Sequence, residues 1–194
     1  MALFTASKGY KALDWQSNTN SRVTKAVSGK TQRIKTGSQH WSFKLQSPAL
    51  SRADFMTDYS FVVQLDGQVT AFTIVPPEIG STRGTATGTL TNDATVALGQ
   101  SAAQTDGGSG TLKKGDLIKF SNHDKVYMLT ADVTISGTND AISFYPPLTT
   151  GITSSTTITY SAVPLKVYQD KDQIKFVTQA DGLYKYEITL NEEI

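Results

Sequence analysis

Alternation of apolar and polar residues over residues 31–48 predicts a β-strand with one buried face. Trp41, Phe43 and Leu45 are separated by single polar residues, so they lie on one side of an extended chain, and Pro48 ends the run. The residues before this strand have neither the two-residue period of a strand nor the 3.6-residue period of a helix. We therefore expect residues 1–30 to form an extended N-terminal arm.

The stretch LSRADFMTDYSFVVQLDGQ has the pattern of a helix, over about residues 51–66. Ser51 is a typical N-cap, and Leu50 and Phe55 occupy the two positions of a hydrophobic staple. Gly67 stands where a left-handed C-cap would. Apolar residues at helical spacing predict a buried face made of Phe55, Met56, Tyr59, Val62 and Val63.

Short strands separated by turn residues are predicted for most of the remaining chain. VTAFTIV ends at Pro76-Pro77, and segments such as LIKF, KVYML and TITYS follow at the spacing of a small β-barrel or sandwich. In the last run, GLYKYEITLNEEI, the residues Tyr184, Tyr186 and Ile188 alternate with polar ones. This run predicts a strand with a half-exposed face.

Taken together, these elements predict a mainly β (α+β) protein. Residues 31–77 and 164–194 are expected to form a β-sandwich with one packed helix. Residues 78–163 are expected to form a small β-barrel module inserted into it. The sequence therefore predicts an arm, a sandwich and an insertion.

Charge is uneven only near the N-terminus. The net charge of +1 gives no general reason to expect a membrane or sequence-specific binding of nucleic acid. The arm is either a solvated segment or one that becomes ordered on an acidic or repeated partner surface. From Lys8 to Lys35 the only acid is Asp14, against the basic residues Lys8, Lys11, Arg22, Lys25, Lys30, Arg33 and Lys35.

The absence of cysteine excludes disulfides and thiolate chemistry. The sequence begins without a signal-peptide pattern, and no segment approaches the ~20 apolar residues of a membrane span. We expect a soluble protein that stays where it is made or leaves inside a larger particle.

The two histidines do not suggest catalysis. His123 and Asp124 lie in SNHDK, which is typical of a hairpin tip, and His40 is isolated. No nucleophile elbow, paired zinc ligands, calcium loop or phosphate loop occurs. We therefore predict a non-enzyme with no catalytic residue, cofactor or metal. Two alternatives stay open: a carbohydrate-binding adhesin of a virion and, behind it, a hydrolase assembled in space.

Five motifs follow one another between Gln39 and Ile194: W-x-F-x-L-x-x-P, SRADFMTDYSFVVQLDGQ, GQVTAFTIVPP, GD-x-I-x-F…KVY-x-L-x-x-DV and FYPPL. Their order resembles that of tail and baseplate structural proteins of tailed bacteriophages, of the distal-tail or tail-tube-like ring type. The resemblance covers roughly four-fifths of the chain.

This resemblance implies a structural role carried by surfaces. It implies a tail-tube-like ring, hexameric, that joins the tail tube to the hub or baseplate. The other partners would be tube, hub and baseplate proteins, and the location the virion after synthesis in the host cytoplasm. Distal-tail, tube-initiator and terminator positions stay open. The residues we expect to contact partners are Trp15, Arg22, Lys25, Arg33, His123, Asp124, Tyr184 and Tyr186.

Overall fold

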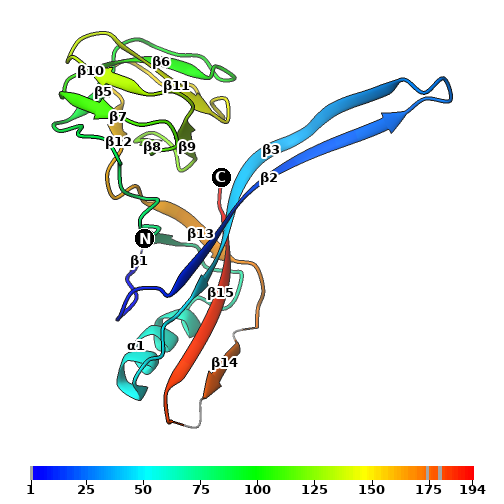
Figure 1. Cartoon of the computed structure of the whole chain (residues 1–194), viewed down its shortest axis with the longest axis vertical. Coiled ribbons are helices and arrows are strands. Elements are labelled where there is room, and N and C mark those ends of the chain that lie inside the picture. The colour runs from blue at the N-terminus through cyan, green and yellow to red at the C-terminus, as the bar shows by residue number, and fades with distance from the viewer. Residues whose placement is uncertain (1, 174, 179–180) are drawn as a thin grey trace.

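The computed structural model describes residues 2–173, 175–178 and 181–194, and it is mostly β with one helix (Figure 1). This confirms the predicted fold class. Outside the insertion, the elements are β1 (Leu3–Phe4), β2 (Ala12–Lys25), β3 (Thr31–Gln46), α1 (Arg52–Val63), β4 (Phe72–Ile74), β13 (Leu165–Gln169), β14 (Lys175–Thr178) and β15 (Tyr184–Glu192). Within it are β5 (Leu90–Asn92), β6 (Ala102–Asp106), β7 (Gly110–Leu112), β8 (Leu117–Phe120), β9 (Val126–Leu129), β10 (Val133–Ile135), β11 (Asp140–Tyr145) and β12 (Thr157–Thr159).

The strands outside the insertion form one seven-stranded sheet in the order β1-β4-β13-β15-β3-β2, with β14 also paired to β15. The last strand in sequence, β15, therefore lies between β13 and β3. Pairing of Leu190 with Phe43 and of Ile188 with Leu45 places apolar side chains on one face. That face packs against α1, and the opposite face carries polar residues such as Lys44 and Glu187, which form an ion pair of 2.7 Å.

Helix α1 begins as the sequence predicts. The Ser51 side chain accepts a hydrogen bond from the Asp54 amide (3.2 Å), and its hydroxyl donates to the Asp54 carboxylate (2.8 Å). The predicted apolar face is wrong in part, because Met56 and Val63 are exposed. The buried positions are Phe55, Asp58 and Val62.

A polar network explains why Asp58 lies inside. Its carboxylate accepts the Tyr186 hydroxyl at 2.9 Å and both the amide and the hydroxyl of Ser7, at 3.0 and 2.6 Å. These bonds connect the N-terminal segment, the helix and the central strand β15. The predicted C-cap is also displaced. The helix is capped by Gln64, and Gly67, with φ of 66°, lies in the turn beyond.

Residues of the insertion form a closed barrel in the strand order β11-β6-β5-β12-β8-β9, accompanied by the strand pair β7 and β10. The barrel has its own core, in which the rings of Phe120, Tyr127 and Phe144 contact one another edge to face. This confirms the small barrel predicted from the sequence. Of the aromatic side chains that a carbohydrate-binding module would offer to a sugar, Tyr127 and Phe144 are buried and not available, whereas Tyr145 is 38% exposed.

The hairpin of β2 and β3 extends away from both the sheet and the barrel (Figure 1). Its register shifts between Thr19 and Ser21, opposite Gly37, where a Cβ would lie only 3.1 Å from the Asn20 side-chain nitrogen. Beyond this irregularity, residues 20–36 are all exposed. We call residues 20–36 the ribbon. The segment predicted as an arm thus includes a strand paired along its length.

Candidate functional site

The barrel is attached to the sheet through strands β8 and β9. Leu117 and Val126 point out of the barrel and belong to the hydrophobic core of the sheet and helix. The Trp41 indole N–H donates to the Val126 carbonyl at 2.9 Å. The barrel is therefore packed against the sheet, and contacts other than the two connecting chain segments hold it there.

A buried ion pair lies at the centre of this attachment. Lys125 and Glu192 have no exposed side-chain surface, and the Lys125 ammonium donates to a Glu192 carboxylate oxygen and to Gln39 Oε1. The Glu192 carboxylate also accepts the amides of Trp41 (3.0 Å) and Val126 (2.9 Å). Burial lowers the pKa of Lys125, although the charge of Glu192 acts in the opposite direction. Each group is costly to bury alone, so the pair requires barrel and sheet to be together.

The predicted hairpin tip is the turn between β8 and β9, and it also contacts the sheet. Asp124 pairs with Lys119 (3.0 Å) on the barrel and with Lys166 (3.4 Å) on β13. His123 Nε2 lies 2.7 Å from the Tyr127 hydroxyl, and Nδ1 lies 2.7 Å from Asn122 Oδ1. Burial lowers the pKa of His123, and the nearby Lys119 charge acts in the same direction against the weaker effect of Asp124.

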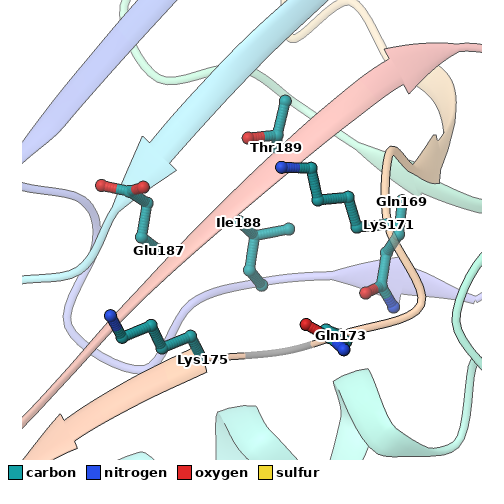
Figure 2. Close-up of a pocket in the computed structure, with 7 residues that line it drawn as sticks. All are labelled: Gln169, Lys171, Gln173, Lys175, Glu187, Ile188 and Thr189. Atoms are coloured by element: carbon teal, nitrogen blue, oxygen red, sulfur yellow. The ribbon is translucent and has the colours of Figure 1, made fainter.

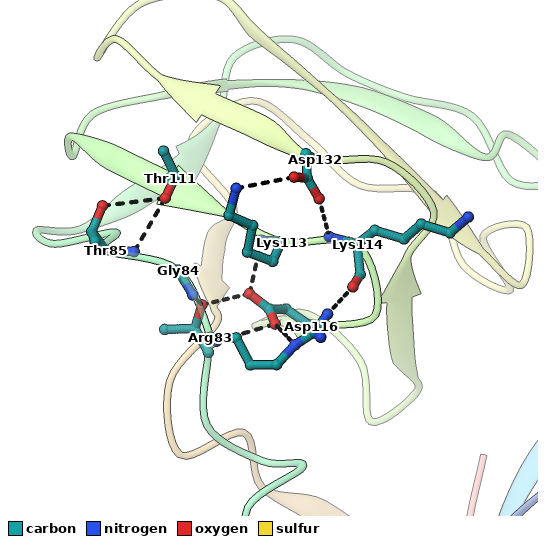
Figure 3. Close-up of polar contacts among 9 residues, drawn as sticks. Arg83, Gly84, Thr85, Thr111, Lys113, Lys114, Asp116 and Asp132 are labelled. Carbon is teal, nitrogen blue, oxygen red and sulfur yellow. Dashed lines mark hydrogen bonds and ion pairs between the residues drawn. The ribbon is translucent and has the colours of Figure 1, made fainter.

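A second polar cluster secures the segment that leads into the barrel (Figure 3). Asp116 follows Gly115, whose φ is 92°, and its buried carboxylate accepts from the Thr82 hydroxyl (2.6 Å) and the Lys113 amide (2.9 Å). It also accepts from the Arg83 amide (3.1 Å) and Nε (3.3 Å). Burial alone would raise the pKa of Asp116, but these hydrogen bonds outweigh it and the pKa lies below its ordinary value.

The ribbon brings three predicted interaction residues together. Arg33 lies opposite Val23 in the ladder, Lys25 lies two residues along, and Arg22 is on the other face beside Ile34. None of the basic residues of the ribbon forms an ion pair with another described residue. Lys35, at the base of the ribbon, lies 5.9 Å from the ring of Tyr145 on the barrel.

Of the other three predicted interaction residues, Tyr186 lies in the core, and Trp15 and Tyr184 are partly buried against it. Trp15 stacks on Phe43, with ring centroids 5.3 Å apart, and also contacts Trp41. Tyr184 stacks on Phe55 at 4.8 Å. Tyr186 is 6% exposed, and burial together with its bond to Asp58 raises its pKa. Their role toward partners stays a prediction, and their observed contacts are internal.

A shallow hollow of about 240 Å³ lies where β13 and β14 meet the edge of β15 (Figure 2). It is lined by polar and charged side chains with Ile188, and it is smaller than the ~300–1,000 Å³ of typical ligand pockets. In the described part of the chain, no three His, Cys, Asp or Glu side chains are grouped to hold a metal ion. No helix among the residues described is long and apolar enough to cross a membrane.

The sequence reasoning missed the junction residues Lys125 and Glu192. A signal was present for Glu192, because it continues the two-residue period of Tyr186, Ile188 and Leu190 on the buried face of β15. No such pattern singled out Lys125, since its partners are distant in sequence.

Comparison with known families gives a match over the barrel. Residues 79–163 match the family described as distal tail protein pb9, B domain. No curated protein matches the chain. The matched segment is rather less than half of the chain, and it supports a tailed-phage distal tail protein, a structural tail component of the virion.

Proposed function

Since residues 79–163 match the B domain of distal tail protein pb9, we propose that this chain is a ring-forming subunit of a phage tail that joins the tail tube to the hub or baseplate. In this proposal the subunits associate head to tail around the tail axis, as a hexamer. They are made in the host cytoplasm and function in the assembled tail.

The observation that carries this proposal is the ribbon. An isolated two-stranded hairpin is only marginally stable in water, yet residues 20–36 project with both faces exposed and no core beneath them. Projecting elements of this kind gain stability when a neighbouring protein covers them. The ribbon therefore supports a subunit that works inside an assembly.

The asymmetry of the sheet supports an orientation within the ring. Helix α1 covers the apolar face, while the opposite face exposes or half-exposes polar residues such as Lys44, Lys185, Glu187 and Thr189. We place the helix on the outside of the ring and this polar face toward the channel. The barrel, fixed to the sheet by the Lys125–Glu192 pair, then keeps one orientation in every subunit.

The test is electron microscopy of the purified chain and of tails that contain it with a small fused tag on the barrel. We expect ring-shaped class averages, and tag density at a single level near the end of the tail tube. Tag density spread along the whole tail, or a tail fraction free of the chain, would overturn the proposal.

A further inference from the structure

The ribbon concentrates the positive charge of the molecule. Residues 20–36 contain Arg22, Lys25, Lys30, Arg33 and Lys35 and no acidic residue, although the whole chain carries a net charge of only +1. The other thirteen basic residues therefore face all seventeen acidic ones, which leaves the rest of the molecule with a net charge of −4. One copy thus offers a basic projection, and another copy offers an acidic body.

The charges lie mainly on one face of the ribbon. Ladder pairing places Lys25, Arg33 and Lys35 on the same face, with Val23 among them. Val23 is 60% exposed, Ile34 on the other face is 52% exposed, and Val27 in the turn is fully exposed. Apolar side chains among the charges fit a protein surface better than the phosphates of a nucleic acid, which require only charge and hydrogen bonds.

The barrel carries an acidic surface, opposite in charge to the ribbon. Asp93 follows β5, Asp106 is the last residue of the paired strand β6, and the Asp93 amide donates to the Gln104 carbonyl at 2.9 Å. The Asp106 charge raises the pKa of Asp93, since the two carboxylates are close together. Neither carboxylate is paired with Lys or Arg among the described residues.

Within one copy, the ribbon does not contact this acidic surface. It meets its own barrel at Tyr145, the last residue of β11, through Lys35. Asp106 contacts the other end of that strand, where it accepts the Asn139 amide at 2.7 Å. At about 3.3 Å per residue, the two ends of β11 are roughly 17 Å apart, and the ribbon runs away from the barrel in Figure 1.

We propose that the ribbon of one copy docks along the Asp93–Asp106 edge of the barrel of a second copy. The contact is head to tail, so repetition around an axis closes a ring. Lys35 contacts Tyr145 of its own copy, so the charged face that it shares with Lys25 and Arg33 is turned toward the barrel side of the ribbon; beyond Lys35 this face is exposed and open to a second copy. This inference rests on the proposed ring function and names the contact that would build the ring.

Paired charge reversals test the contact. The ribbon variant combines Lys25→Glu with Arg33→Glu, and the barrel variant combines Asp93→Lys with Ala94→Lys. All four positions are exposed, and Asp106 keeps its bond to Asn139, so both variants should fold. The control variant combines Arg52→Glu with Lys171→Glu, which makes the same change in net charge as the ribbon variant at exposed sites outside the ribbon. Thermal unfolding verifies the fold of each variant.

Self-association is measured by sedimentation at low and high salt. We expect the wild-type chain to associate, less so in high salt, and each reversal to weaken association at least about tenfold. The control variant should associate like the wild type. Mixing the ribbon and barrel variants should restore association, because every contact in an alternating ring then joins opposite charges. Such mixed rings close only with an even number of subunits.

Three results would overturn the inference. They are a wild-type chain that stays monomeric at about 1 mM, reversals that leave association unchanged, and a mixture that fails to recover it. A further result would also count against the inference. In it, the wild-type chain does not self-associate but binds duplex DNA, and this binding is lost in the ribbon variant and unchanged in the barrel variant. Incorporation into tails is scored separately with the same variants. A wild-type chain that enters tails without this contact would leave the proposed function standing and remove only the inference.

Discussion

Asp116 is the acceptor that joins the segment leading into the barrel to the turn before β8. Its four hydrogen bonds are made by one buried carboxylate, so Asp116→Asn replaces an acceptor-only group with one that has a single acceptor oxygen. We expect a loss of roughly 1–3 kcal/mol in the free energy of unfolding, measured by urea denaturation at neutral pH.

The matched control is Asp132, which contacts the same turn before β8. Asp132 accepts the Lys114 amide at 2.8 Å but is exposed, so Asp132→Asn should cost clearly less than Asp116→Asn. Equal losses would show that the burial of Asp116 is not what matters. Because the pKa of Asp116 is depressed, its contribution is complete above the ordinary aspartate pKa and is lost as the pH falls through the folded-state value.

His123 should make the stability of the protein depend on pH in the range where histidine titrates, at higher pH than Asp116. Its pKa is lowered in the folded state, so the unfolded chain binds a proton as the pH falls through the ordinary histidine value while the folded chain does not. The free energy of unfolding should therefore fall between pH 7.5 and 5.5, and His123→Gln should reduce this dependence. Superimposable pH profiles for the variant and the wild type would contradict the expectation.

Single residues were the hardest features to predict from the sequence. Trp41, Phe43 and Leu45 were recognised because alternation alone assigns them to a buried face. Asp58 and Lys125 were not, because a buried charge depends on partners that the fold supplies from far away. Lys125, for example, contacts Gln39 and Glu192. Met56 and Val63 were wrongly assigned to the core, because the helical pattern did not reveal that Asp58 is buried.

Among the elements, the helix and the barrel strands could be predicted because each has one buried face. Strand β2 could not, and the physical reason lies in the ribbon. A strand shows alternation only where one side is covered, and from Asn20 onward both sides of β2 are exposed. The absence of a pattern, which predicted only an extended arm, is here the mark of a hairpin that lacks a core.

Removing the ribbon should therefore cost the folded subunit little. Thr19 and Gln39 are paired, so residues 20–38 can be replaced by Asn-Gly, a two-residue hairpin turn. We expect the melting temperature to change by only a few degrees, because no buried side chain is removed, while entry into tails is abolished. A large fall in the melting temperature would mean that the ribbon stabilises the subunit itself.

At the scale of the whole molecule, the Lys125–Glu192 pair holds the barrel and the sheet in one arrangement. Lys125→Met leaves Glu192 buried without a cation, and we expect a loss of about 3–5 kcal/mol. Adding Glu192→Gln should recover part of this loss, since it removes the stranded charge and its one amide oxygen can still accept either the Trp41 or the Val126 amide. A double-mutant cycle by urea denaturation measures the coupling.

Limited proteolysis of the same variants reports on the domain organisation. If residues 78–163 form a module inserted into the sheet domain, cleavage should concentrate near its two connections and accelerate in Lys125→Met. Cleavage scattered through the barrel strands, with no preference for the connections, would contradict the predicted boundaries.

The position of β15 has a consequence for the order in which the protein folds during synthesis. All the strands of the barrel lie within residues 90–159, so the barrel can fold once this segment has left the ribosome. The sheet cannot, because the strand between β13 and β3 is translated after all the other strands that the structure describes. At this stage a nascent chain holds all the strands of the barrel, while the sheet to which the barrel attaches is still incomplete.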